Sequence, residues 1–186
     1  MKELSLNILD IAKNSTAAGA SQVGISLELS EDAILTLSIT DNGCGMDEET
    51  LAGVTNPFYT TRKTRKVGMG LPLLKMAAEQ TGGELRISSS TKVGESGTSL
   101  VATFDTSSID CMPLGDIIST VCILIAGSPN VDFVFTDKRP AGVVSLDTAQ
   151  IREVLGEGIS LAEPEIQQWI REYLEEQYLE FVSTQN

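Results

Sequence analysis

Four short groups of residues in this sequence have the types and spacing to bind a nucleotide. The first is a carboxylate and an amide four positions apart, Asp10 and Asn14. On a helix this spacing places both side chains on one face, one turn apart. An Asn oxygen can complete the coordination of Mg²⁺ when water and phosphate oxygens supply the rest. A carboxylate one turn away could deprotonate a water molecule or a substrate hydroxyl. Asp10 is therefore a candidate catalytic base and Asn14 a candidate magnesium ligand.

The second group, residues 41–46, places an acid before a glycine-rich turn. Asp41 ends a predicted strand, where its carboxylate can accept a hydrogen bond from the exocyclic amine of adenine. Guanine has a carbonyl at that position and cannot donate. Gly43 and Gly45 permit a tight turn and a close approach of the backbone to a ring, and Met46 offers an adaptable apolar wall. The same pattern also fits an ordinary turn after a strand and, more weakly, a calcium loop.

The third group is the glycine-rich turn Gly68-Met69-Gly70-Leu71, which stands before a predicted helix. Backbone amides at such a helix start can bind phosphate groups. Four of the 13 basic residues of the chain lie just before it, between positions 62 and 66. A solvated loop is the other reading of such a run. The candidate phosphate contacts in it are Lys63, Arg65 and Lys66.

The fourth group is Gly97-Thr98, which stands between a predicted turn and a predicted strand. The two commonest phosphate-binding loops, G-x-x-x-x-G-K-[ST] and G-x-G-x-x-G between a strand and a helix, are absent from the sequence. The nucleotide site predicted here therefore uses a different architecture.

Hydrophobic periodicity predicts the elements that must position these groups. Up to residue 104 we expect helices over 3–18 and 72–81 and strands over 23–29, 34–39, 85–87 and 99–104. They predict an α+β fold, a two-layer α/β sandwich with one sheet and helices on one face. We expect a small C-terminal α/β extension with helices over 115–126, 147–155 and 163–181 and a hairpin of 131–135 and 143–146 across a turn at 137–140.

Charge separates the chain into two parts. Residues 1–104 carry 9 basic and 12 acidic side chains, whereas residues 105–186 carry 4 and 14. We therefore expect a nucleotide-binding domain over 1–104 and an acidic accessory subdomain over 105–186. The second part is either a packed support or a surface for a partner or a second copy.

Composition excludes several classes of function. The net charge of −13 argues against nucleic-acid binding. No apolar run approaches the roughly 18 residues that span a membrane, so we expect no membrane insertion. Three cysteines without a C-x-x-C pair fit a reducing cytoplasm better than a disulfide framework or a zinc site. The sequence contains no histidine, which rules out a histidine-dependent triad or a phosphoacceptor histidine within it.

In their order and spacing, the four groups resemble the ATP site of the GHKL (Bergerat-fold) superfamily of gyrase-type topoisomerases, heat-shock chaperones, histidine kinases and mismatch-repair ATPases. In the superfamily's mismatch-repair and gyrase form a Glu usually occupies the position of Asp10, so the resemblance is less secure for catalysis than for magnesium. It covers roughly residues 1–104 and implies ATP and Mg²⁺ as cofactors. The matching segments are residues 10–21 for the N-box, 41–46 for the G1 box, 56–62 for the F-box, 68–71 for the G2 box and 95–98 for the G3 region. The match to the G3 region implies that Thr98 supports the adenine ring through a water molecule.

The N-box begins almost at Met1, so we expect neither dimerisation helices nor a sensor before it. The chain most resembles short stand-alone bacterial histidine-kinase-like ATP-binding proteins and, more loosely, anti-sigma-factor serine kinases. This resemblance implies an Mg-ATP-binding regulatory protein that acts as a kinase in trans on a partner protein. Alternatives are a non-catalytic, ATP-gated partner-binding module and a slow ATPase. The expected partner is a regulator, a phosphoacceptor or a redox enzyme, with a homodimer as a further alternative.

Overall fold

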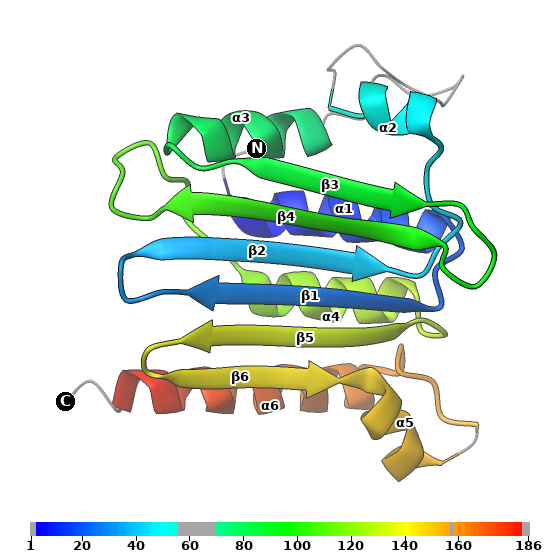
Figure 1. Cartoon of the computed structure of the whole chain (residues 1–186). Helices are drawn as coiled ribbons and strands as arrows, with labels where there is room; N and C mark the ends of the chain where they lie inside the picture. Colours follow the sequence, from blue (N-terminus) through cyan, green and yellow to red (C-terminus); the bar gives the residue numbers. More distant parts are fainter. Residues whose placement is uncertain (1–2, 56–69, 157, 184–186) are drawn as a thin grey trace.

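The fold is built on one six-stranded sheet in the order β3-β4-β2-β1-β5-β6, shown in Figure 1. The computed structural model describes residues 3–55, 70–156 and 158–183, with side chains up to residue 180. The strands are β1 (Gln22–Leu29), β2 (Ile34–Asp41), β3 (Leu85–Ser90), β4 (Gly97–Asp105), β5 (Asp132–Arg139) and β6 (Gly142–Asp147). The helices are α1 (Leu4–Ala17), α2 (Glu48–Gly53), α3 (Gly70–Gln80), α4 (Ile117–Gly127), α5 (Thr148–Leu155) and α6 (Pro164–Ser183).

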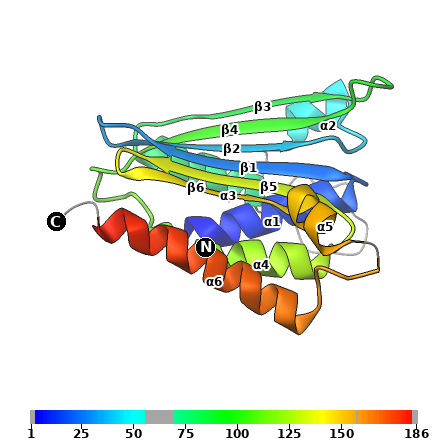
Figure 2. The ribbon, with the colours of Figure 1, turned by 90° about the horizontal axis from the view of Figure 1, so that it is seen from below.

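The strands alternate between a buried and a more polar face. On β1 and β2 the buried side chains are Val23, Ile25, Leu27, Leu35, Leu37 and Ile39. This period of two predicts a sheet that buries one face. Helices α1, α3, α4 and α6 cover the apolar face (Figure 2), which confirms the predicted two-layer α/β sandwich.

The C-terminal extension joins the same sheet. Strand β5 pairs with β1 in parallel, with Gln22 opposite Asp132, and β6 pairs with β5 antiparallel. The buried side chains of the extension, including Phe133 and Phe135, belong to the same hydrophobic cluster as those of the first part. The extension therefore completes one edge of the sheet that carries the predicted nucleotide site.

The predicted turn at residues 137–140 is wrong. Strand β5 continues to Arg139, and Asp137 lies inside it with no exposed surface. Three bonds from Arg139, of 2.9–3.2 Å, and one from the Tyr178 hydroxyl at 2.7 Å reach its carboxylate. Burial and the negative charge of Asp137 raise the pKa of Tyr178, so its hydroxyl keeps its proton and donates. A buried carboxylate with these partners is tolerated in a core strand.

Candidate functional site

Helix α1 presents Asp10 and Asn14 to solvent on one face, as their spacing predicts. The opposite face of the helix is buried and holds Leu4, Ile8, Ile11 and Ala12 against the sheet and its neighbouring helices. Packing on that face fixes the helix, so Asp10 and Asn14 project from a rigid support.

Asp41 stands at the end of β2 and is held by two hydrogen bonds. The Ser15 hydroxyl donates to Oδ2 at 2.6 Å, and the Gly43 amide donates to Oδ1 at 3.0 Å. Ser15 is nearly buried, at 5% exposed, and follows Asn14 directly on α1. Bonds to a charged acceptor are short and strong, so Ser15 joins the adenine-binding candidate to the helix that carries the candidate magnesium ligand.

The carboxylate of Asp41 keeps acceptor capacity after these two bonds. An ionised carboxylate has about four lone-pair positions, and two are occupied here. The side chain is partly exposed. Its remaining capacity fits a donor such as the adenine amine.

Thr98 lies directly opposite Asp41 in the pairing of β2 with β4. Ser89 of β3 connects it to the rest of the site: the Ser89 hydroxyl accepts from the Met46 amide and donates to the Gly97 carbonyl, both at 2.8 Å. The Ser89 proton is thus already in use, so in its 2.9 Å contact with Ser89 the Thr98 hydroxyl is the donor. This leaves the lone pairs of Thr98 to accept a hydrogen bond from a water or a ligand amine.

Two glycines permit the close approach of the segments around Asp41. Gly45 and Gly97 have φ angles of 72° and 146°, in the region that glycine adopts without strain. A Cβ on Gly45 would collide with the Ser90 carbonyl, and a Cβ on Gly97 would collide with the Asp41 carbonyl. The backbone conformation and the close packing of the turn therefore require glycine at both positions.

Asn42, which we did not single out from the sequence, has a structural task. Its side-chain oxygen accepts from the amides of Ser21 and Gln22, each at 2.9 Å, and its side-chain nitrogen donates to the Ser21 hydroxyl at 2.8 Å. These bonds attach the turn after β2 to the start of β1. Sequence reasoning also missed Ser15 and Ser89, and the only signal for Ser15 was its place beside Asn14.

Helix α3 begins at Gly70, directly beside Asp10. A Cβ on Gly70 would collide with Oδ2 of Asp10, and α1 and α3 pack together. Gly70 is buried and Leu71 is half-buried. The structure therefore brings together Asp10 and the start of an 11-residue helix, whose amide groups favour anions. Other predicted phosphate contacts, namely Lys63, Arg65, Lys66 and Gly68, lie outside the described residues.

The donor set decides how a magnesium ion could be held. Within residues 3–55, 70–156 and 158–183, no three Cys, Asp or Glu side chains are grouped as metal ligands. Asn14 is a neutral oxygen donor on the exposed face of α1, and Mg²⁺ often binds few protein ligands together with phosphate oxygens and water. The residues present fit an ion that is shared with a nucleotide.

The three cysteines should differ in reactivity, because the thiolate is the nucleophile. Cys44 is exposed in the turn after Asp41. Burial raises the pKa of Cys122, and burial together with the charge of Asp105 raises that of Cys111. A raised pKa leaves less thiolate at neutral pH, so Cys111 and Cys122 should gain reactivity only as the pH increases.

We therefore expect iodoacetamide at neutral pH to modify Cys44 much faster than Cys111 or Cys122, as peptide mass spectrometry can measure. An ATP analogue should slow labelling of Cys44 and leave labelling of Cys111 unchanged. If Cys122 reacts first, the described packing of α4 is wrong.

Comparison with known proteins identifies the first part of the chain. A sequence profile described as "Histidine kinase-, DNA gyrase B-, and HSP90-like ATPase" matches residues 1–108. The chain is similar to the autoinducer 2 sensor kinase/phosphatase LuxQ of Vibrio vulnificus, with 31% identity over 97 residues, which is 48% of this chain and 11% of that protein. It is also similar to the signal transduction histidine-protein kinase AtoS of Escherichia coli, with 33% identity over 89 residues, 48% of this chain and 14% of that protein. The chain thus spans only a small part of each of these relatives.

A solved structure supports the same fold. The N-terminal domain of a DNA repair protein superposes with a TM-score of 0.54 at 14% identity, covering 79% of this chain and 52% of that one. Among the residues described, no helix has the length and apolar character needed to cross a membrane. The profile match extends over more than half of the 186 residues. The chain therefore belongs to the family of histidine kinase-, DNA gyrase B- and HSP90-like ATPases.

Proposed function

We propose that this chain binds Mg-ATP and transfers the γ-phosphate to a separate partner protein. The observation that carries the proposal is the bond between Ser15 and Asp41. Because of it, the same short helix that bears Asp10 and Asn14 also fixes the candidate adenine acceptor. The adenine and the phosphates of a nucleotide would thus be bound by residues that α1 holds in fixed positions relative to one another. Phosphoryl transfer requires such positioning.

Each residue has a defined task in this proposal. Asp41 and Thr98 bind the adenine edge, Asn14 contributes an oxygen to Mg²⁺, and the amides at the start of α3 face the phosphates. The magnesium ion would neutralise developing phosphate charge. Asp10 would accept the proton of an acceptor hydroxyl as its oxygen bonds to the γ-phosphorus, the bond to the bridging oxygen breaks, and ADP leaves.

The kinase assignment is favoured by the relatives, because LuxQ and AtoS are described as kinases. The acceptor would be a hydroxyl or a histidine of the partner. A histidine acceptor must lie outside these 186 residues, because they contain no histidine. A partner histidine would need Asp10 only to orient the acceptor nitrogen. A cytoplasmic regulator, phosphoacceptor or redox enzyme is the expected partner.

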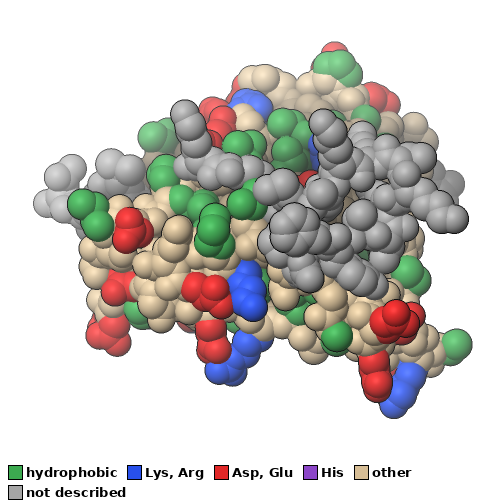
Figure 3. Space-filling model, turned by 90° about the horizontal axis from the view of Figure 1, so that it is seen from above, with side chains coloured by type: hydrophobic (Ala, Val, Ile, Leu, Met, Phe, Trp, Pro, Cys, Tyr) green, Lys and Arg blue, Asp and Glu red, His purple; other side chains and the backbone are tan. Residues whose placement is uncertain are grey.

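An ATP-gated binding module is the second candidate, and apolar surface near the site favours it. Leu6 of α1 is 43% exposed and Met76 of α3 is 49% exposed, on two helices that pack together. Hydrophobic side chains also gather on the face of the molecule seen in Figure 3. Asp10 is one methylene shorter than the Glu usual in related sites, which weakens its case as a base. Slow ATP hydrolysis without transfer is a third outcome.

The proposal is tested with γ-labelled ATP, the purified chain and candidate partners from a cell extract. Asp10→Asn should reduce transfer to the partner far more than ATP binding, because a general base stabilises mainly the transition state, typically by a factor of 10² to 10⁴. Asp32→Asn, in the exposed turn between β1 and β2, is the matched control and should transfer normally. Partner binding that responds to a non-hydrolysable analogue, without label, would favour the gated module. Formation of ADP at a rate that no partner changes, without label on any protein, would favour the slow ATPase.

The dependence of ATP affinity on Mg²⁺ should require the side chain of Asn14. We expect Asn14→Ala to remove most of the magnesium-dependent gain in ATP affinity without unfolding the protein, because the residue is exposed on α1. Titration calorimetry with and without Mg²⁺ measures this gain. Asn130→Ala, which removes the same amide from an exposed turn elsewhere, should behave like the parent. If Asn14→Ala retains the full magnesium effect, Asn14 is not a ligand.

A further inference from the structure

A concave site lies in the C-terminal extension, and its lining includes no residue of the predicted nucleotide site. It is a groove of about 760 Å³ between α5, α6 and the β5–β6 hairpin, which we call the α5–α6 groove. All of its lining residues fall after the residues that the family profile matches. Its apolar walls comprise Ile151, Val154, Leu155, Ile166, Trp169 and Tyr173.

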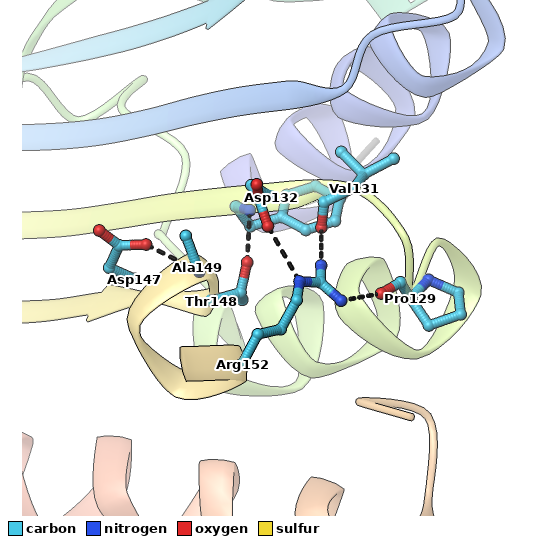
Figure 4. A network of polar contacts seen from close by, with 8 residues as sticks. Pro129, Val131, Asp132, Asp147, Thr148, Ala149 and Arg152 are labelled. Carbon is cyan, nitrogen blue, oxygen red and sulfur yellow. Dashed lines mark hydrogen bonds and ion pairs between the residues drawn. The ribbon is translucent and has the colours of Figure 1, made fainter. Parts of the chain in front are cut away.

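The α5 wall of the groove is fixed by polar contacts (Figure 4). The guanidinium of Arg152 bonds to the Asp132 carboxylate at 3.0 Å and to the Val131 carbonyl at 2.7 Å, and also reaches the Pro129 carbonyl. Asp147 caps the helix by accepting from the Ala149 amide at 2.9 Å. These bonds hold α5 against the start of β5.

The α6 wall is fixed to the sheet as well. The side-chain amide of Gln177 accepts from the Ser145 amide at 3.0 Å and donates to the Ser145 carbonyl at 3.2 Å. Tyr178 donates to the buried Asp137 on the neighbouring strand. Because both walls are held in place, the groove is formed before any ligand binds, which lowers the entropy cost of binding.

The groove exposes large apolar side chains that a binding partner would cover. Trp169 is 48% exposed, Tyr173 is 38% exposed, and Val154 on the opposite wall is 86% exposed. The rings of Trp169 and Tyr173 stack with centroids 5.3 Å apart. A rigid aromatic pair beside aliphatic residues is typical of the anchor points of protein interfaces.

The charge around the groove indicates which charge a partner's contacting surface should carry. Glu165, Glu172 and Glu176 lie three, four or seven positions from Trp169, so they project from the same side of α6. All three are exposed. Residues 105–186 carry 14 acidic and 4 basic side chains, so two copies of this face would repel one another. The rim therefore favours a basic partner.

The form of the partner follows from the edge of β6. A strand that added to this edge would need the outward amide and carbonyl of Ser145, and Gln177 already occupies both. A helix requires no such bonds, because its backbone groups are satisfied internally. We propose that the α5–α6 groove binds an amphipathic helix of a partner protein, with its apolar side chains against Trp169, Tyr173 and Val154 and its Lys or Arg side chains against the acidic rim. This site goes beyond the proposed phosphoryl transfer and does not depend on bound nucleotide.

Trp169 is the only tryptophan of the chain, so its fluorescence reports on the groove directly. The probe is a synthetic peptide of Leu and Lys in an order that makes one helical face apolar. We expect it to shift the Trp169 emission to shorter wavelength, with an affinity that falls as salt is added. A peptide of the same composition in scrambled order, and a Leu and Glu peptide of the same pattern, should bind at least about tenfold more weakly.

Two pairs of variants make the test specific. Val154→Lys should weaken binding of the Leu and Lys peptide about tenfold or more, because it places a charge on the apolar wall. Val93→Lys, at another highly exposed valine, in the β3–β4 turn, should not change it. Glu172→Lys should weaken binding, whereas Glu31→Lys in the β1–β2 turn should leave it nearly unchanged.

Several results would overturn the proposal. These are equal effects of Val154→Lys and Val93→Lys, equal binding of the scrambled or acidic peptide, or an unchanged Trp169 spectrum on binding. Concentration-dependent dimerisation of the chain alone, abolished by Val154→Lys, would show that a second copy occupies the groove instead. ATP binding measured on the same variants keeps this test separate from the nucleotide site: Val154→Lys should bind ATP as the parent does.

Discussion

Asp41→Asn is expected to lower ATP affinity by roughly tenfold to a hundredfold. The substitution replaces a charged acceptor, held by Ser15 and Gly43, with an amide whose NH₂ group faces one of these donors. Loss of a hydrogen bond to a charged group costs about 1.5–3 kcal/mol, which corresponds to this change in affinity. Calorimetric titration with an ATP analogue provides the measurement.

The selectivity of the parent protein is part of the same prediction. It should bind ATP more tightly than GTP, because guanine offers a carbonyl where Asp41 needs a donor. Asp32→Asn makes the same chemical change in an exposed turn and should leave affinity unchanged. Equal binding of ATP and GTP, or normal affinity of Asp41→Asn, would remove Asp41 from the adenine site.

The largest effect on stability should come from Asp137→Ala. The variant would leave the Arg139 guanidinium and the Tyr178 hydroxyl without their shared acceptor. Breaking a buried ion pair from one side typically costs about 3–5 kcal/mol in the free energy of unfolding. We expect about 3 kcal/mol here, because the Arg139 side chain is still 33% exposed and water can replace part of the interaction. Urea unfolding measures the difference.

A double variant distinguishes the lost interaction from a general core defect. Asp137→Leu combined with Arg139→Met replaces both charges with apolar groups and should recover much of the loss, since apolar pairs often substitute well for buried ion pairs. Asp132→Ala removes a partly exposed carboxylate of the same strand and should be less destabilising than Asp137→Ala. If Asp137→Ala unfolds at the urea concentration of the parent, the buried network contributes nothing.

The sequence predicted the local features of the site and the layout of its first part. The alternation of apolar and polar residues located β1 and β2. The position of Asp41 at the end of β2 followed from this alternation. Asp10 and Asn14 share a face of α1 because their spacing is a property of any helix. These features depend on neighbouring residues in the chain, so a sequence pattern can reveal them.

Contacts between distant segments could not be predicted in this way. The bond from Ser15 to Asp41 depends on how α1 packs on the sheet, and the contact of Ser89 with Thr98 depends on the pairing of β3 with β4. Asp137 looked like a turn residue because its partners, Arg139 and Tyr178, become visible only in three dimensions. The division into domains at residue 104 stays a prediction, although β5 continues the sheet without a break.

The parallel pairing of β1 with β5 has a consequence for folding during synthesis. The paired residues Gln22 and Asp132 are roughly 110 positions apart, and contacts so distant form slowly because a long loop must close first. Strand β1 meets β2 early, but its other edge must wait until β5 has been made. During that interval a row of unpaired backbone groups beside Val23, Ile25 and Leu27 can attract other chains. Chaperone demand should therefore be greatest for ribosome-bound chains that stop between residues 41 and 132, and should fall once the β5–β6 hairpin has emerged.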